Sequence, residues 1–152
     1  MLRQYLVGAA ASVCNITIHA LVMVTVIRVV RVVDAWATTH QTFRLIAVMI
    51  ATVTVLMIAH LAEVLVWSSI YVMTAAAPDG TDLIYFAFVN YTTLGYGDVT
   101  PVERWHLLGP MTAMNGVLLF GWSTAVIFEI LRMTLLAGGG GPEKQEKRWW
   151  VE

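Results

Sequence analysis

The chain alternates between long apolar stretches and short polar connections. The apolar stretches cover residues 5–27, 45–74 and 107–128. Each reaches the length of about 20 apolar residues that a helix needs to cross a bilayer. The first and third contain no Asp, Glu, Lys or Arg, and the second contains only Glu63. This pattern predicts three transmembrane helices, the first of them a retained span.

The segment between the second and third stretches, residues 79–101, has a different character. It combines acidic residues, threonines, glycines and a cluster of aromatic side chains. It is too short to cross the membrane and return as two helices, and its middle is too apolar for a solvated loop. We therefore expect a re-entrant half-helix followed by an extended return. Irregular backbone at membrane depth is tolerated where it is buried in protein or lines a watery cavity.

Composition supports the membrane assignment and removes several function classes. Of the 152 residues, 59% are hydrophobic and only 12% are charged, about half the charge of a soluble domain. The net charge of -1 leaves no basic excess for nucleic acid. No nucleotide-binding, hydrolase or dinucleotide motif is present, so we expect neither an enzyme nor a small-molecule substrate. The single cysteine, Cys14, excludes an intrachain disulfide.

The basic residues are distributed unevenly around the predicted spans. Seven of the nine Lys and Arg residues follow the first or the third span, and they fall on one side of the membrane. Because positive charge concentrates on the cytoplasmic side, the N-terminus is expected outside and the C-terminus inside. The small size and the lack of a targeting segment favour a prokaryotic plasma membrane.

The run Thr-Leu-Gly-Tyr-Gly-Asp at residues 93–98 is the candidate functional motif. Gly95 and Gly97 tolerate the left-handed backbone conformation without steric cost. Alternating the sign of φ turns successive carbonyls of a strand to one side, whereas an ordinary strand points them to opposite sides. The run therefore predicts a column of carbonyls with the Thr93 hydroxyl beneath it. Several such columns facing one another replace the water shell of a monovalent cation, while Leu94 and Tyr96 pack behind.

This motif resembles the selectivity filter of the tetrameric pore-loop potassium channels, which runs Thr-Val-Gly-Tyr-Gly-Asp. The wider string TDLIYFAFVNYTTLGYGDVTP is similar to a pore helix, a filter and its exit, and the resemblance extends over about residues 79–136. Together with the three predicted spans, it implies an all-α membrane protein with three transmembrane helices per chain, a re-entrant pore helix and a filter, assembled as a homotetramer. The partners are then membrane lipid and other copies of the chain. No cofactor is implied beyond permeant potassium ions.

The resemblance also divides the chain. The expected parts are an extra N-terminal helix (1–33), a cytoplasmic connection (34–44), an outer helix (45–77), a pore helix (81–92), a filter (93–98), an inner helix (107–136) and a flexible cytoplasmic tail (138–152).

Individual roles follow from the same resemblance. Potassium ions are expected at Thr93, Leu94, Gly95 and Tyr96, with Gly97 also lining the path and Asp98 at the outer mouth. The expected support of the filter consists of Tyr85, Phe86, Val89 and Thr92, and Thr81 or Asp79 is expected to cap the pore helix. Leucine at position 94, where relatives carry valine, leaves a weakly selective cation channel as the alternative function.

Two features of the expected inner helix allow two interpretations each. Gly116 and Gly121 lie near the positions of a hinge glycine and a second small residue in the family, but glycine is also common as a close-packing site. Glu129 either forms a ring of four carboxylates at the inner mouth or pairs with Arg132 at i,i+3.

Four polar residues lie at similar depth in the first two spans, namely Asn15, His19, His60 and Glu63. Ionisable groups at this depth are costly and normally find protein partners. The simplest interpretation is a hydrogen-bonded cluster that docks the first helix on the second. A proton sensor is a second interpretation. A third, far less favoured, is an intramembrane metal site that uses His19, His60 and Glu63.

Overall fold

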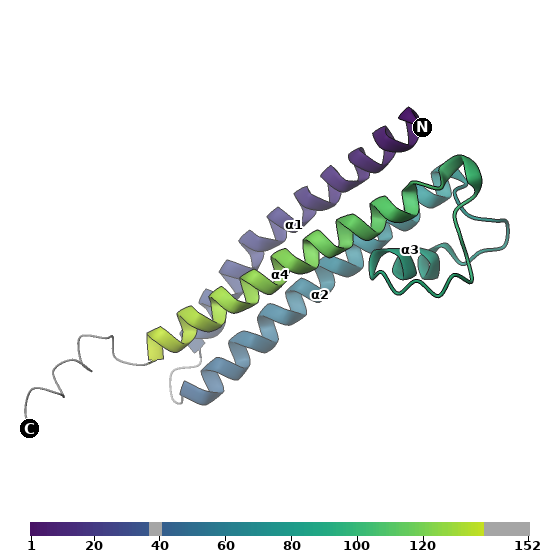
Figure 1. Cartoon of the computed structure of the whole chain (residues 1–152). Helices are drawn as coiled ribbons and strands as arrows, with labels where there is room; N and C mark the ends of the chain where they lie inside the picture. Colours follow the sequence, from purple (N-terminus) through teal and green to yellow (C-terminus); the bar gives the residue numbers. More distant parts are fainter. Residues whose placement is uncertain (37–40, 139–152) are drawn as a thin grey trace, which may run out of the picture.

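The computed structural model describes residues 1–36 and 41–138, with side chains described for residues 1–32 and 41–136. Three long helices dominate it: α1 (Leu2–Trp36), α2 (Gln41–Thr74) and α4 (Leu108–Gly138). They lie side by side along most of their length (Figure 1). All three are long and apolar enough to cross a membrane. Within the described ranges there is no β-strand, so the predicted all-α membrane architecture is confirmed.

The helix boundaries differ from the expected ones by a few residues. The first helix continues past residue 33 to Trp36, and α2 begins at Gln41, so helix occupies much of the expected connection. α4 extends to Gly138, and the rest of the expected tail lies outside the described residues.

The outer helix ends at Thr74 instead of residue 77 because the chain closes it with a left-handed residue. Ala75 has φ 46°, and the amides of Ala75 and Ala76 donate back to the carbonyls of Val72 and Tyr71, both at 3.2 Å. This pair of bonds is the Schellman arrangement that satisfies the last carbonyls of a helix.

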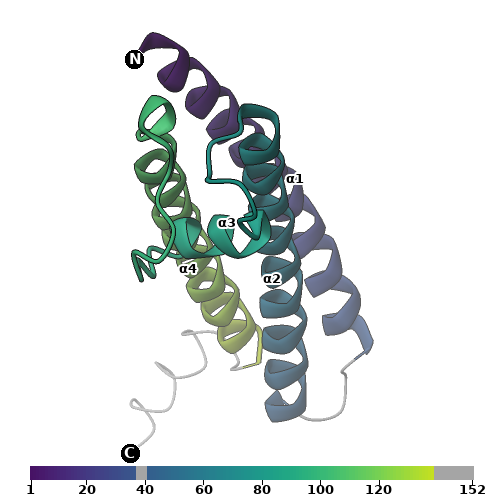
Figure 2. The ribbon, with the colours of Figure 1, turned by 90° about the vertical axis from the view of Figure 1, so that its right-hand side faces the viewer.

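The short helix α3 (Leu83–Tyr91) lies across α2 and α4, in the half of the molecule that holds the N-terminus (Figure 2). Its cap is Asp82, whose Oδ1 accepts from the amides of Ile84 (3.0 Å) and Tyr85 (3.1 Å). The expectation that Thr81 or Asp79 caps this helix is therefore wrong. Only the residue directly before the first turn has its side chain within reach of those free amides.

Two apolar cores hold the helices together. The core beneath α3 includes Trp67, Tyr71, Phe86 and Tyr91, all fully buried. The core at the far end is built by Val26, Val48, Leu56 and Ile130. Many large apolar side chains on the outside of the three spans stay exposed in the single chain, as expected of surfaces that meet lipid or another membrane-embedded chain.

Candidate functional site: the pore loop and its support

The segment that follows α3 turns sharply out of the helix. Thr92 ends the helix with its amide bonded to the carbonyl of Phe88 at 2.9 Å. The amides of Thr93 and Leu94 then donate to the carbonyls of Asn90 (3.1 Å) and Val89 (3.0 Å). Val89 thus supports the start of the run through its backbone. These bonds fix the position from which residues 93–98 leave the helix.

The backbone of the run alternates in the sign of φ. Thr93, Gly95 and Gly97 have φ values of 59°, 66° and 75°, whereas Leu94 and Tyr96 between them do not take positive φ. The two glycines behave as the sequence predicts. Thr93 was not predicted to be left-handed, because a β-branched residue is costly there, by about 1–2 kcal/mol. No local signal in the sequence reveals it.

The run is exposed along its whole length, from Thr92 to Asp98. Tyr96 is 68% exposed and Leu94 is 52% exposed. Within one chain, the side chains expected to pack behind the carbonyl column therefore have little to pack against.

The aromatic residues of α3 divide between the outer mouth and the core. The Tyr85 hydroxyl donates to Asp98 Oδ2 at 2.6 Å, and this hydrogen bond to a carboxylate raises the pKa of Tyr85 above its ordinary value. Phe86 is instead buried against Tyr71, with ring centroids 4.8 Å apart. Tyr85 thus holds the end of the run at Asp98, and Phe86 anchors α3 on α2.

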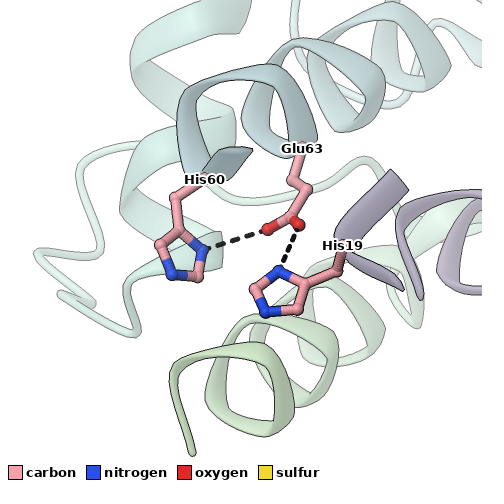
Figure 3. Close-up of side chains that lie close together, drawn as sticks. All are labelled: His19, His60 and Glu63. Atoms are coloured by element: carbon pink, nitrogen blue, oxygen red, sulfur yellow. Dashed lines mark hydrogen bonds and ion pairs between the residues drawn. The ribbon is translucent and has the colours of Figure 1, made fainter. Parts of the chain in front are cut away.

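A polar cluster lies buried between the helices behind this loop, centred on Glu63 (Figure 3). His19 Nδ1 lies 2.8 Å from Glu63 Oε1, and His60 Nδ1 lies 3.0 Å from Glu63 Oε2. The Tyr91 hydroxyl donates to Glu63 Oε2 as well. Three donors from α1, α2 and α3 thus converge on one carboxylate. The contacts match the helix-docking interpretation.

The cluster extends to α4 through residues that the sequence analysis missed. Ser123 Oγ lies 3.0 Å from His60 Nε2 and 3.4 Å from His19 Nε2. Asn115 Oδ1 accepts from Asn15 Nδ2 and from Trp67 Nε1, both at 3.0 Å. Asn115 and Ser123 are eight residues apart, so they fall on one face of a helix. This eight-residue spacing was the signal in the sequence that could have identified the two residues.

On α4 the two glycines differ. A Cβ on Gly116 would come within 2.0 Å of the Tyr91 carbonyl oxygen, whereas one on Gly121 would meet nothing within 4 Å. Gly116 is therefore a close-packing site for the end of α3. Nothing in the structure tests a hinge at either position.

Glu129 forms the ion pair that was the alternative to a carboxylate ring. Its two oxygens accept from Arg132 at 2.7 and 2.9 Å. The ring of four carboxylates needs other copies of the chain and stays a prediction.

The fold and this site define a membrane-spanning protein with a re-entrant pore loop between two long helices. A family model described as ion channel matches residues 59–133, from the middle of α2 to near the end of α4. Residues 59–133 therefore match the pore-loop ion channel family, and the match covers just under half of the chain. Helix α1 lies outside the match. The searches of curated proteins and of solved structures gave no match.

Proposed function

We propose that four copies of this chain form a potassium-selective channel whose filter is the run from Thr93 to Gly97. The observation that supports this most strongly is the alternating sign of φ at residues 93, 95 and 97, directly after a helix that ends at Tyr91. Alternating φ is what a column of carbonyls facing one way requires. Dehydrated potassium ions then pass between carbonyl oxygens that replace their water.

The need for other subunits follows from the exposure of the run. Each chain supplies one filter strand, and a ring of carbonyls around an ion needs several. Residues 92–98 are exposed in the single chain, which fits a segment that packs against copies of itself around an axis. The resemblance to tetrameric channels favours four copies.

The surroundings of the run suit a permeant cation. The carbonyl end of α3 precedes the filter directly, and the C-terminal end of a helix carries partial negative charge. Asp98 adds a carboxylate at the other end of the run, held by Tyr85. Both the helix end and the carboxylate attract a cation electrostatically.

We also propose that the N-terminus lies outside and the C-terminus in the cytoplasm. The start of α1 and the pore loop lie at the same end of the molecule (Figures 1 and 2). Arg44 marks the opposite end, where its Nη2 donates to the Thr134 carbonyl at 3.0 Å. The second half of α1 carries Arg28 and Arg31, and the second half of α4 carries Arg132. This arrangement fits the positive-inside rule, and a prokaryotic plasma membrane remains the expected location.

The test is a reversal-potential measurement on purified protein in planar bilayers. A tenfold potassium gradient should shift the reversal potential by about 59 mV, the value for one monovalent charge. Sodium on one side and potassium on the other should give a reversal potential far from zero. A current that reverses near zero would replace this proposal with the weakly selective channel, and absence of current would overturn it.

A further inference from the structure

The buried cluster around Glu63 has the composition of a metal site as well as of a docking contact. His19, His60 and Glu63 each place one ligand atom so that all three lie within 4.8 Å of one another. His19 and Glu63 are fully buried, and the His60 side chain is 12% exposed. They come from two helices, and His19 is 44 residues from Glu63, so the grouping is a product of the fold.

Each histidine of the cluster turns one ring nitrogen toward Glu63 and the other toward Ser123 Oγ. If both histidines donate to an ionised Glu63, which accepts only, each of them carries its proton on Nδ1. Both Nε2 atoms are then acceptors, and both face Ser123 Oγ, at 3.4 and 3.0 Å. The serine hydroxyl has a single proton. One of the two buried Nε2 atoms is left without a donor, which is unfavourable in a buried site.

A metal ion on the Glu63 side removes this need for a second donor at Ser123. If the two Nδ1 atoms bind a metal, each imidazole proton moves to its Nε2. Two N–H groups then face Ser123 Oγ, whose two lone pairs accept both. Histidines that bind metals usually donate their second ring N–H to such a partner. No proton is gained or lost in this exchange.

We propose that His19, His60 and Glu63 bind one divalent metal ion of the zinc type per chain. Two imidazole nitrogens and a carboxylate are ligands that Zn²⁺ accepts. The Tyr91 hydroxyl, 2.9 Å from His60 Nδ1, lies where it offers a further oxygen. Since Tyr91 is the last residue of α3, the metal joins α1 and α2 at a point two residues before the filter run begins at Thr93.

The experiment is metal titration of the purified full chain after treatment with a chelator. Co²⁺ should bind once per chain and give the intense visible absorption of a four-coordinate site, and Zn²⁺ should displace it. The absence of that spectrum in the wild-type protein would overturn the proposal, whatever the variants do. If the spectrum is absent and the cluster only takes up a proton on acidification, its cation is the proton and the metal assignment is wrong.

Variants locate the site. His19→Asn keeps an N–H donor near Glu63 but removes the ligand nitrogen, and Glu63→Gln keeps the volume of the side chain. Each should weaken Zn²⁺ binding at least tenfold. Ser123→Ala leaves all three ligands in place but removes the acceptor for the two Nε2–H groups, and loss of such a partner costs about 10–100-fold in affinity.

Tyr71→Phe is the matched control. Its hydroxyl makes a buried 2.6 Å bond from α2 to Thr112 on α4, so the variant loses a comparable interhelical bond outside the cluster. Its affinity for Zn²⁺ should equal that of the wild type. Equal affinity in Tyr71→Phe, Glu63→Gln and wild type would overturn the proposal, because the bound metal would then lie elsewhere. If one cluster variant does not fold, the other two provide the same comparison.

Discussion

The filter run and the Glu63 cluster meet at the end of α3, yet their environments are opposite. Residues 92–98 are exposed, and the amides that begin the run are bonded to the helix just before it. Glu63 is fully buried and accepts from side chains of three helices, with α4 joined through Ser123. The chain thus completes the support of the pore loop by itself and leaves residues 92–98 exposed, with the bond from Tyr85 to Asp98 holding their outer end to α3.

This difference separates two kinds of variant. Changes in the cluster act on packing between helices and should affect stability before they affect conduction. Substitutions in residues 93–98 remove few contacts within the chain, so they should affect conduction with little loss of stability. The variants below test this division, from the largest expected change in stability to the smallest.

The largest loss of stability is expected for Glu63→Ala. It removes the acceptor shared by His19, His60 and Tyr91, and removing one partner of a buried ionic contact costs about 3–5 kcal/mol. Thermal unfolding in detergent, followed by the survival of the native peak in size-exclusion chromatography, measures the loss. The conservative Glu63→Gln should retain more stability. A Glu63→Ala protein as stable as the wild type would show that the cluster does not dock the helices.

A smaller loss is expected for Gly116→Ala. The added methyl would lie 2.0 Å from the Tyr91 carbonyl oxygen, so α4 and the end of α3 must separate, and such overpacking costs about 1–3 kcal/mol. Gly121→Ala is the control on the same helix, because its methyl meets nothing within 4 Å. It should be neutral or stabilising by up to about 1 kcal/mol. Equal melting of the two variants would contradict the packing role of Gly116.

The sequence predicts those features that depend on local pattern. The three spans follow from the length of the apolar stretches, and the re-entrant helix follows from the mixed polar and aromatic composition of residues 79–101. The positive φ of Gly95 and Gly97 follows from the lack of a Cβ. The pairing of His19, His60 and Glu63 was expected as well, because ionisable groups at one depth in two helices seek each other.

Other features depend on tertiary contacts that no local pattern encodes. Tyr91 joins the cluster because α3 packs on α2, whereas Asn115 and Ser123 join it because α4 packs on α1 and α2. The left-handed φ of Thr93 runs against the preference of its own side chain.

In the run itself, Gly95→Ala should leave the fold nearly intact and remove potassium current. Gly95 has φ +66°, and holding an L-residue there costs about 1–2 kcal/mol. The local backbone is expected to relax by turning a carbonyl out of the column. Bilayer recording and thermal unfolding on the same preparation measure both effects. Wild-type current in this variant would contradict the filter assignment, and unfolding as severe as that of Glu63→Ala would contradict the division between the two regions.

The smallest effect on stability is expected for Tyr85→Phe, because the bond from Tyr85 to Asp98 is exposed. That bond raises the pKa of Tyr85 in the folded protein, so its contribution is present below about pH 10, the ordinary pKa of tyrosine. It is lost as pH rises through the raised pKa, when the phenolate meets the Asp98 carboxylate. The difference in tyrosinate absorbance between wild type and Tyr85→Phe isolates this titration. In Asp98→Asn the acceptor is neutral, so the midpoint of Tyr85 should fall back toward 10. An identical midpoint with aspartate and asparagine at position 98 would show that the two side chains do not interact in solution, and the outer end of the run would then lack the one side-chain contact that ties it to α3.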